Sequence, residues 1–115
     1  MKKGKYNAGM MRNRVTIQRN DLEADGGGGF ADDWHSIATG IPAQLMPADE
    51  NENVHGGQLE TPTRLRVVMR YRDDIQPRMR LIEETLEQTF NIQSIINVEY
   101  RNRWLELVVT EGVAQ

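Results

Sequence analysis

The chain has 115 residues, a net charge of −3 and an isoelectric point of about 5.4, and this length favours a single domain. It contains no cysteine, which excludes disulfide scaffolds, thiolate metal sites and cysteine nucleophiles. No apolar run approaches the ~18 residues that a membrane-spanning helix needs, so we expect no membrane partner and synthesis in the cytoplasm.

Alternation of apolar and polar residues predicts three strands in the first half of the chain. These strands cover residues 14–19, 34–38 and 41–46. Between the first two, residues 21–29 are predicted to form a hairpin tip, because its four consecutive glycines tolerate positive φ angles. Thr39 and Gly40 are expected to form the next turn, and Pro42 favours a strand start or a sheet edge.

The clearest predicted strand covers residues 64–72, where arginines alternate with apolar residues. One face carries Leu65, Val67, Met69 and Tyr71, and the other carries Arg64, Arg66, Arg70 and Arg72. Residues 47–63, which precede this strand, are polar and contain a glycine pair and two prolines. We predict a long loop there, in which a helical turn is possible but not required.

The rest of the chain continues the pattern, with predicted strands over residues 79–82, 90–98 and 104–110. Residues 83–88 are interpreted as a hairpin connection, with a helical turn as the alternative, since Glu, Leu and Gln favour helices. Residues 100–103 make the last turn. Six or seven short strands without a convincing helix predict an all-β fold, a small antiparallel barrel or sandwich.

This pattern also predicts the domain organisation. Residues 1–10 are expected to be a flexible extension, residues 11–111 a single β-barrel domain, and residues 112–115 a tail. Deletion of residues 1–9 is therefore expected to leave the domain folded.

Charged residues are segregated along the chain. Residues 1–20 carry six basic and no acidic side chains, whereas residues 21–60 carry nine acidic and no basic ones. Residues 61–82 carry six arginines against two aspartates, and residues 83–115 carry six glutamates against two arginines. Such blocks can form faces of opposite charge that meet complementary faces of neighbours. Folding can equally interleave them into a mixed surface.

No motif in the sequence supports catalysis. The glycine run lacks the Lys-Ser/Thr pair of a phosphate-binding loop, and no serine elbow is present. His35 follows Trp34 in a predicted strand, which favours a structural role over that of a general base. The acidic clusters around Asp32 and Asp49 lack the spacing of a calcium loop. We therefore expect no catalytic residue, no metal site and no cofactor.

Six arginines between residues 64 and 80 are the most pointed feature of the chain. They can contact phosphates, pair with acids on an adjacent strand or on a neighbouring subunit, or form a solvated face. The acidic isoelectric point disfavours nucleic acid, and the preference for arginine over lysine favours fixed pairing between proteins. The predicted subunit or partner interface comprises Arg64, Arg66, Arg70, Arg72, Arg78 and Arg80. Reversing the charges of Arg66 and Arg70 is expected to weaken assembly and spare the monomer's fold.

Several of these segments occur in an order that is typical of one family. They are residues 11–19, 34–38, 41–47, 63–75, 79–81, 90–92 and 104–107. Each is an ordinary strand pattern, but their order and spacing cover about residues 11–111. In this respect the chain resembles the head–tail joining proteins of tailed bacteriophages, also called head-completion, head-closure or stopper proteins.

The resemblance implies a virion protein without enzymatic activity, which assembles at the head–tail interface. It implies a homo-oligomeric ring, dodecameric or hexameric, below the portal and its adaptor and above a tail terminator or tail tube. The ring would close the head, and packaged DNA would pass without sequence-specific binding. Residues 47–63 match a loop that projects towards the channel, and the candidate lumen residues are Asp49, Glu50, Glu52, His55 and Glu60. The alternatives are a tail-completion or minor tail protein, and a stand-alone nucleic-acid-binding barrel.

Overall fold

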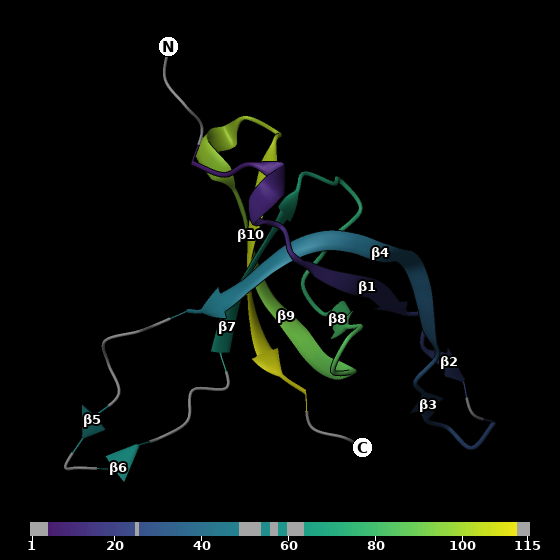
Figure 1. Cartoon of the computed structure of the whole chain (residues 1–115). Helices are drawn as coiled ribbons and strands as arrows, with labels where there is room; N and C mark the ends of the chain where they lie inside the picture. Colours follow the sequence, from purple (N-terminus) through teal and green to yellow (C-terminus); the bar gives the residue numbers. More distant parts are fainter. Residues whose placement is uncertain (1–4, 25, 49–53, 56–57, 60–63, 113–115) are drawn as a thin grey trace.

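Six antiparallel strands close into a barrel in the computed structural model, which describes residues 5–24, 26–48, 54–55, 58–59 and 64–112 (Figure 1). The barrel strands are β1 (Asn13–Asn20), β4 (Trp34–Pro47), β7 (Arg64–Arg70), β8 (Arg80–Glu83), β9 (Gln88–Asn97) and β10 (Trp104–Glu111). Around the barrel their order is β1-β4-β7-β10-β9-β8, and β8 pairs with β1 to close it. The predicted all-β fold and antiparallel barrel are confirmed.

The inward-facing side chains of these strands form the core. In β7, Val67 and Met69 are buried while Arg64 and Arg70 are exposed, as the alternation predicts. The buried core is Val15, Ile17, Ala43, Val67, Met69, Ile75, Leu81, Phe90, Ile92, Leu105, Leu107 and Val109. Closure gives every barrel strand two neighbours, although β7 pairs only with Ala43–Pro47 of the long strand β4.

The predicted turn at Thr39 and Gly40 is wrong, because β4 runs through both residues as one long curved strand (Figure 1). Its first part pairs with β1 and its last part with β7. Opposite Ile17 the β1–β4 register shifts twice, so that β4 accommodates extra residues as β-bulges. Gly40 supports this bend with a φ of 65°. Pro42 lies inside β4 beside the irregularity, not at a strand start, since bulged strands tolerate proline.

Replacing Gly40 with alanine is expected to lower the free energy of unfolding by about 1–2 kcal/mol, the cost of a left-handed L-residue. A Cβ atom at Gly40 meets no other atom within 4 Å, so the expected loss comes from backbone strain and not from a clash. Urea denaturation would measure it. Gly40→Asn is the matched control, because asparagine adopts this conformation more readily. Equal losses for the two variants would contradict the strain argument.

Two small hairpins lie in the connections between barrel strands. The first pairs β2 (Glu23–Ala24) with β3 (Phe30–Ala31), around the glycine run that was predicted to be a hairpin tip. The second pairs β5 (Val54–His55) with β6 (Gln58–Leu59), within the long loop predicted between β4 and β7. Residues 84–87 form the predicted turn between β8 and β9. The described part of the chain contains no helix that is long and apolar enough to cross a membrane.

A short 3-10 helix, η1 (Ala8–Met10), precedes β1, and a second one, η2 (Val98–Tyr100), begins the connection from β9 to β10. Residues 5–12 lie against the outside of the barrel, where Tyr6 and Met11 are buried together with Val68 and Trp104. The sequence predicts a flexible extension over residues 1–10, whereas Tyr6 is buried and Met10 half-buried against the barrel, and residues 7–9 are exposed. Residues 1–4 lie outside the described residues.

Candidate functional site

The outer face of β7 and β10 carries several of the predicted interface arginines, among them Arg66 and Arg70, together with one buried acid, Glu106. The register places Arg70 opposite Trp104, Val68 opposite Glu106 and Arg66 opposite Val108. These residues point outward because their neighbours Val67, Met69, Leu105 and Leu107 fill the core. The Nε atom of Arg66 lies 4.0 Å from a carboxylate oxygen of Glu106, on the diagonal of the ladder.

Glu106 is buried although it faces outward, because the N-terminal segment covers it. The Tyr6 hydroxyl donates a hydrogen bond of 2.5 Å to its carboxylate, and the Lys5 ammonium lies 3.3 Å from the same oxygen. Burial alone would raise the pKa of Glu106, but the hydrogen bonds from Tyr6 and Lys5 and the charges of Lys5 and Arg66 lower it overall. The carboxylate therefore stays ionised and fastens residues 5 and 6 to the barrel wall.

The same contact raises the pKa of both partners in the N-terminal segment. The pKa of Tyr6 rises because the ring is buried and because its hydroxyl bonds to the Glu106 carboxylate. Hydrogen bonding to Glu106 also raises the pKa of Lys5, which thus remains protonated. Both N-terminal groups keep their protons, as a donor to a carboxylate requires.

Trp104 connects this network to Arg70. The Tyr6 and Trp104 rings meet edge to face, with centroids 6.2 Å apart. The Arg70 guanidinium lies 4.7 Å from the centroid of the Trp104 ring, in cation–π contact. Arg66 and Arg70 thus both have partners within their own chain, which the sequence did not reveal.

The other predicted interface arginines lie on other parts of the barrel. Arg72 pairs with Asp74 in the turn after β7, at 2.8 Å. Arg80, on β8, lies over the Trp34 ring at 3.9 Å and donates to Gln18. Arg64 is exposed at the start of β7, and Arg78 is exposed in the turn before β8 with a φ of 82°. The six arginines do not gather on one face, and their role at an interface stays a prediction.

The candidate lumen residues cannot be placed as a group. Asp49, Glu50, Glu52 and Glu60 lie outside the described residues. The backbone of His55 forms β5, but its side chain is not described. Within the described part of the chain, no three His, Asp or Glu residues come together as a metal site. The lumen role of this loop stays a prediction.

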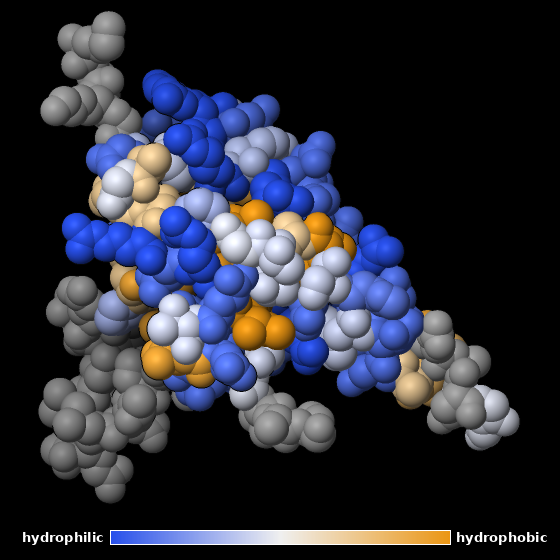
Figure 2. Space-filling model, turned by 45° about the vertical axis from the view of Figure 1, so that its right-hand side comes forward, coloured by the Kyte–Doolittle hydropathy of each residue, from blue (hydrophilic) through white to orange (hydrophobic). Residues whose placement is uncertain are grey.

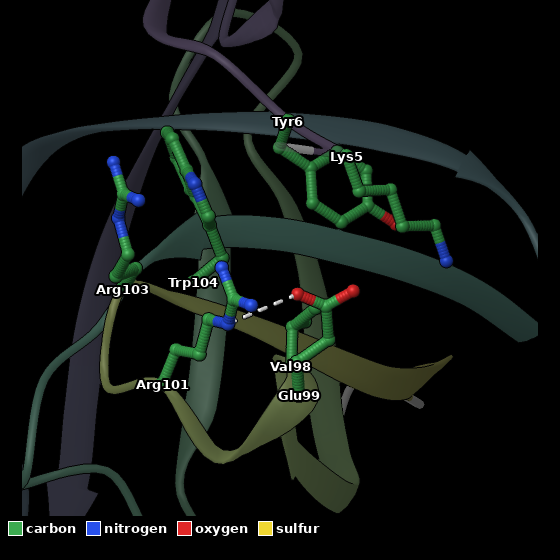
Figure 3. A pocket seen from close by; sticks show the side chains of 7 residues that line it. All are labelled: Lys5, Tyr6, Val98, Glu99, Arg101, Arg103 and Trp104. Atoms are coloured by element: carbon green, nitrogen blue, oxygen red, sulfur yellow. Dashed lines mark ion pairs between the residues drawn. The ribbon is translucent and has the colours of Figure 1, made fainter. Parts of the chain in front are cut away.

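A shallow hollow lies beside this network, between the N-terminal segment and the β9–β10 connection (Figure 3). It is lined by Lys5, Tyr6, Val98, Glu99, Arg101, Arg103 and Trp104. Three of these side chains are basic and one is acidic, and Arg101 pairs with Glu99 at 3.5 Å. At about 70 Å³, the hollow is far below the ~300 Å³ of a cofactor site.

Sequence reasoning missed this hollow because its residues come from segments far apart in the chain. Lys5 and Tyr6 belong to the expected extension, and Arg101 and Arg103 belong to an expected turn. The available signal was Glu106, a single acid in the otherwise apolar run of residues 104–109. A lone acid at such a position needs a partner, and the sequence alone does not show which one.

Comparison with known proteins identifies the family. A family model of phage head completion proteins matches residues 6–112. The chain belongs to this family. The matched region begins at Tyr6, so it includes the segment that packs on Glu106 and covers the whole barrel. The predicted resemblance to head-completion proteins is confirmed, and the chain is a structural phage head completion protein.

The solved structures that are similar to this head completion protein include the following two. The solution structure of protein SF1141 from Shigella flexneri 2a shares 27% identity with a TM-score of 0.71, over 96% of this chain and 100% of that chain. A chain in the virion of a native gene transfer agent particle shares 21% identity with a TM-score of 0.60, over 90% and 98% of the two chains. No curated protein sequence matches the chain significantly.

Proposed function

We propose that the protein forms a ring in the virion, at the head–tail connector of a tailed phage. The observation that carries this proposal is the family match over residues 6–112, which includes every strand of the barrel. The gene transfer agent chain, which belongs to a virion, supports the same setting because the folds are similar. The ring would close the DNA-filled head below the portal or adaptor and offer a docking surface to the tail terminator or tube.

The closed barrel suits a ring whose subunits keep their own fold. Every strand of the six-strand barrel already pairs with two neighbours, which leaves little edge for subunits to join by extending the sheet. Contacts between copies would therefore use mainly loops, hairpins and outer faces. The ring would be a dodecamer or a hexamer. The loop over residues 47–63 would face its channel. Its acids would repel passing DNA and so leave the channel open to it.

Binding to DNA-filled, tailless phage heads tests the proposed function. Purified protein is expected to co-sediment with the heads in stoichiometric amounts and to prevent leakage of the packaged DNA. A variant with Asp49, Glu50 and Glu52 replaced by lysine is expected to bind equally well but to slow DNA ejection. Absence of binding to related heads would contradict head closure. Normal ejection by the variant would contradict only the lumen role of the loop.

The structure weakens the competing proposal of a stand-alone nucleic-acid-binding barrel with β7 as its platform. Arg66 is directed to Glu106 and Arg70 to Trp104, so the β7 face does not present a row of unpaired cations. Phosphate binding there would have to compete with these internal contacts. Steep salt dependence of DNA binding by the isolated protein would restore that alternative.

A further inference from the structure

A first surface without a role in the proposed function is a projecting arm, residues 21–33, which contains the β2–β3 hairpin (Figure 1). The arm carries five acidic residues and no basic one. It also exposes two apolar side chains, Leu22 and Phe30, and Phe30 is 71% exposed. A charged hairpin with an exposed aromatic side chain has the composition of a binding element, since aromatic side chains are enriched at protein interfaces.

The arm is held firmly where it leaves the barrel. The Asp21 amide donates to the Asp33 carbonyl at 2.8 Å, and the Asn20 side chain bonds to both Asp32 and Asp33. Arg19 pairs with Asp21. These contacts fix the direction in which the arm leaves β1.

The second surface is a basic patch at the opposite end of β1, around the hollow at Trp104 (Figure 3). In it Lys5, Arg70, Arg101 and Arg103 outnumber two acids, Glu106 and Glu99, which pair with Lys5 and Arg101. Beside it, Tyr100 is 91% exposed. Its backbone is left-handed, as are those of Glu99 and Asn102, and this turn is fixed by two hydrogen bonds between Asn97 and Asn102. A strained turn that presents an aromatic side chain next to cations is a candidate binding surface.

The arm and the N-terminal segment that contributes to the patch lie at opposite ends of β1 (Figure 1). Residues 5–12 precede β1 and the arm follows it, so the eight residues of β1 separate them by roughly 23 Å, at ~3.3 Å per residue. The face shown in Figure 2 is mostly hydrophilic, with apolar patches that are small and separate. Charge complementarity between arm and patch is therefore a stronger basis for pairing than a shared apolar face.

We infer that the acidic arm of one copy docks on the basic patch of the next copy. Arm and patch are different surfaces of the same subunit, so the contact is head-to-tail, and such contacts generate rings when their rotation closes. The exposed Phe30 would pack near Tyr100, and the acids of the arm would face Arg101 and Arg103. The inference rests on the proposed ring, of which it specifies the subunit contact.

Cross-linking tests this contact directly, because the natural chain has no cysteine. Phe30→Cys protein is mixed with Tyr100→Cys protein and treated with a short bismaleimide. The reaction is carried out once with the mixture free in solution at high concentration and once with the mixture bound to heads. Leu86→Cys replaces Tyr100→Cys in the control, since Leu86 is 70% exposed on the β8–β9 hairpin. The first pair is expected to cross-link about tenfold more than the control pair, as a specific contact should. Equal yields overturn the inference.

A charge swap provides the second test. An arm variant carries Glu23→Lys and Asp32→Lys, and a patch variant carries Arg101→Glu and Arg103→Glu. Each alone places like charges in contact and is expected to weaken self-association by about tenfold or more. In an equal mixture of the two variants, the basic arm of one meets the acidic patch of the other, and the acidic arm meets the basic patch. Both contacts are then attractive, so the mixture is expected to assemble again. Rescue also shows that both variants fold, and a mixture that assembles no better than the separate variants overturns the inference.

The two proposals fail in different ways. If wild-type protein does not bind heads but still cross-links between Phe30→Cys and Tyr100→Cys sites, the subunit contact stands and head closure is contradicted. If heads are bound while cross-linking is equal to the Leu86 control, head closure stands and the contact is overturned. Binding of DNA that competes with the arm would show the patch to be a phosphate site instead.

Discussion

Replacing Tyr6 with alanine is expected to lower the free energy of unfolding by about 3–5 kcal/mol, the range measured for buried aromatic residues. Tyr6 is 8% exposed and packs against Trp104, Met11 and Val68. Its loss would leave a cavity on the barrel wall and would remove a hydrogen bond from the buried Glu106 carboxylate. Denaturation followed by tryptophan fluorescence measures the effect, because Trp104 is in direct contact. Deletion of residues 1–9 is expected to be at least as destabilising, contrary to the sequence-based expectation.

Tyr6→Phe is the control, because it keeps the ring and removes only the hydroxyl. We expect it to cost about 1–3 kcal/mol, since the carboxylate loses a buried donor. A Tyr6→Ala variant as stable as the wild type would show that residues 5–12 do not pack on the barrel. A Tyr6→Phe loss equal to that of Tyr6→Ala would show that packing contributes nothing.

The pH dependence of stability gives an independent check on this contact. The pKa of Glu106 is lowered in the folded state, so the unfolded state binds protons first as the pH falls. The stabilisation is therefore complete above the ordinary value of 4.5 and is lost as the pH drops through the lower folded value. Tyr6→Phe should make the acid-induced loss smaller than in the wild type, because it removes a contact that lowers this pKa.

The sequence predicted those parts of the fold that depend on local alternation. In β7 the pattern identified both faces correctly, since every second side chain must enter the core. It failed at Gly40, because a glycine in a left-handed conformation serves a turn and a β-bulge equally well. Only the pairing of β4 with both β1 and β7 distinguishes the two, and this pairing joins residues far apart in the chain.

The candidate site was predicted less well, because its contacts lie between the chain ends. Tyr6 and Glu106 are separated by 100 residues and meet only when the barrel has closed. The arginine stripe was identified correctly as an outward face. Acids on an adjacent strand and acids on a neighbouring subunit were both considered as its partners, and the interface prediction favoured the subunit. Glu106 and Trp104 meet Arg66 and Arg70 within the chain, and they do so because β10 is the neighbour of β7. The alternation of apolar and polar residues does not show the order of the strands in the barrel. That order determines which residues the β7 arginines contact.

Strand order also changes what charge reversal on β7 should do. Arg66→Glu places a second carboxylate beside Glu106, which is already buried, and removes one of the cations that keep it ionised. We expect a loss of about 2 kcal/mol in the free energy of unfolding, less than for a fully buried pair because Arg66 is partly exposed. The variant would therefore also lower the stability of the monomer, and its weaker assembly would not by itself locate an interface.

Arg78→Glu is the matched control for Arg66→Glu, because it changes the net charge by the same amount at an exposed turn. It should stay within about 0.5 kcal/mol of the wild type. Arg66→Glu combined with Glu106→Gln should lose less than the two single variants together, since the repulsion between carboxylates is then absent. Additive losses would show that Arg66 and Glu106 do not interact. In that case the β7 arginines would again be available to a neighbouring subunit, as the sequence first indicated.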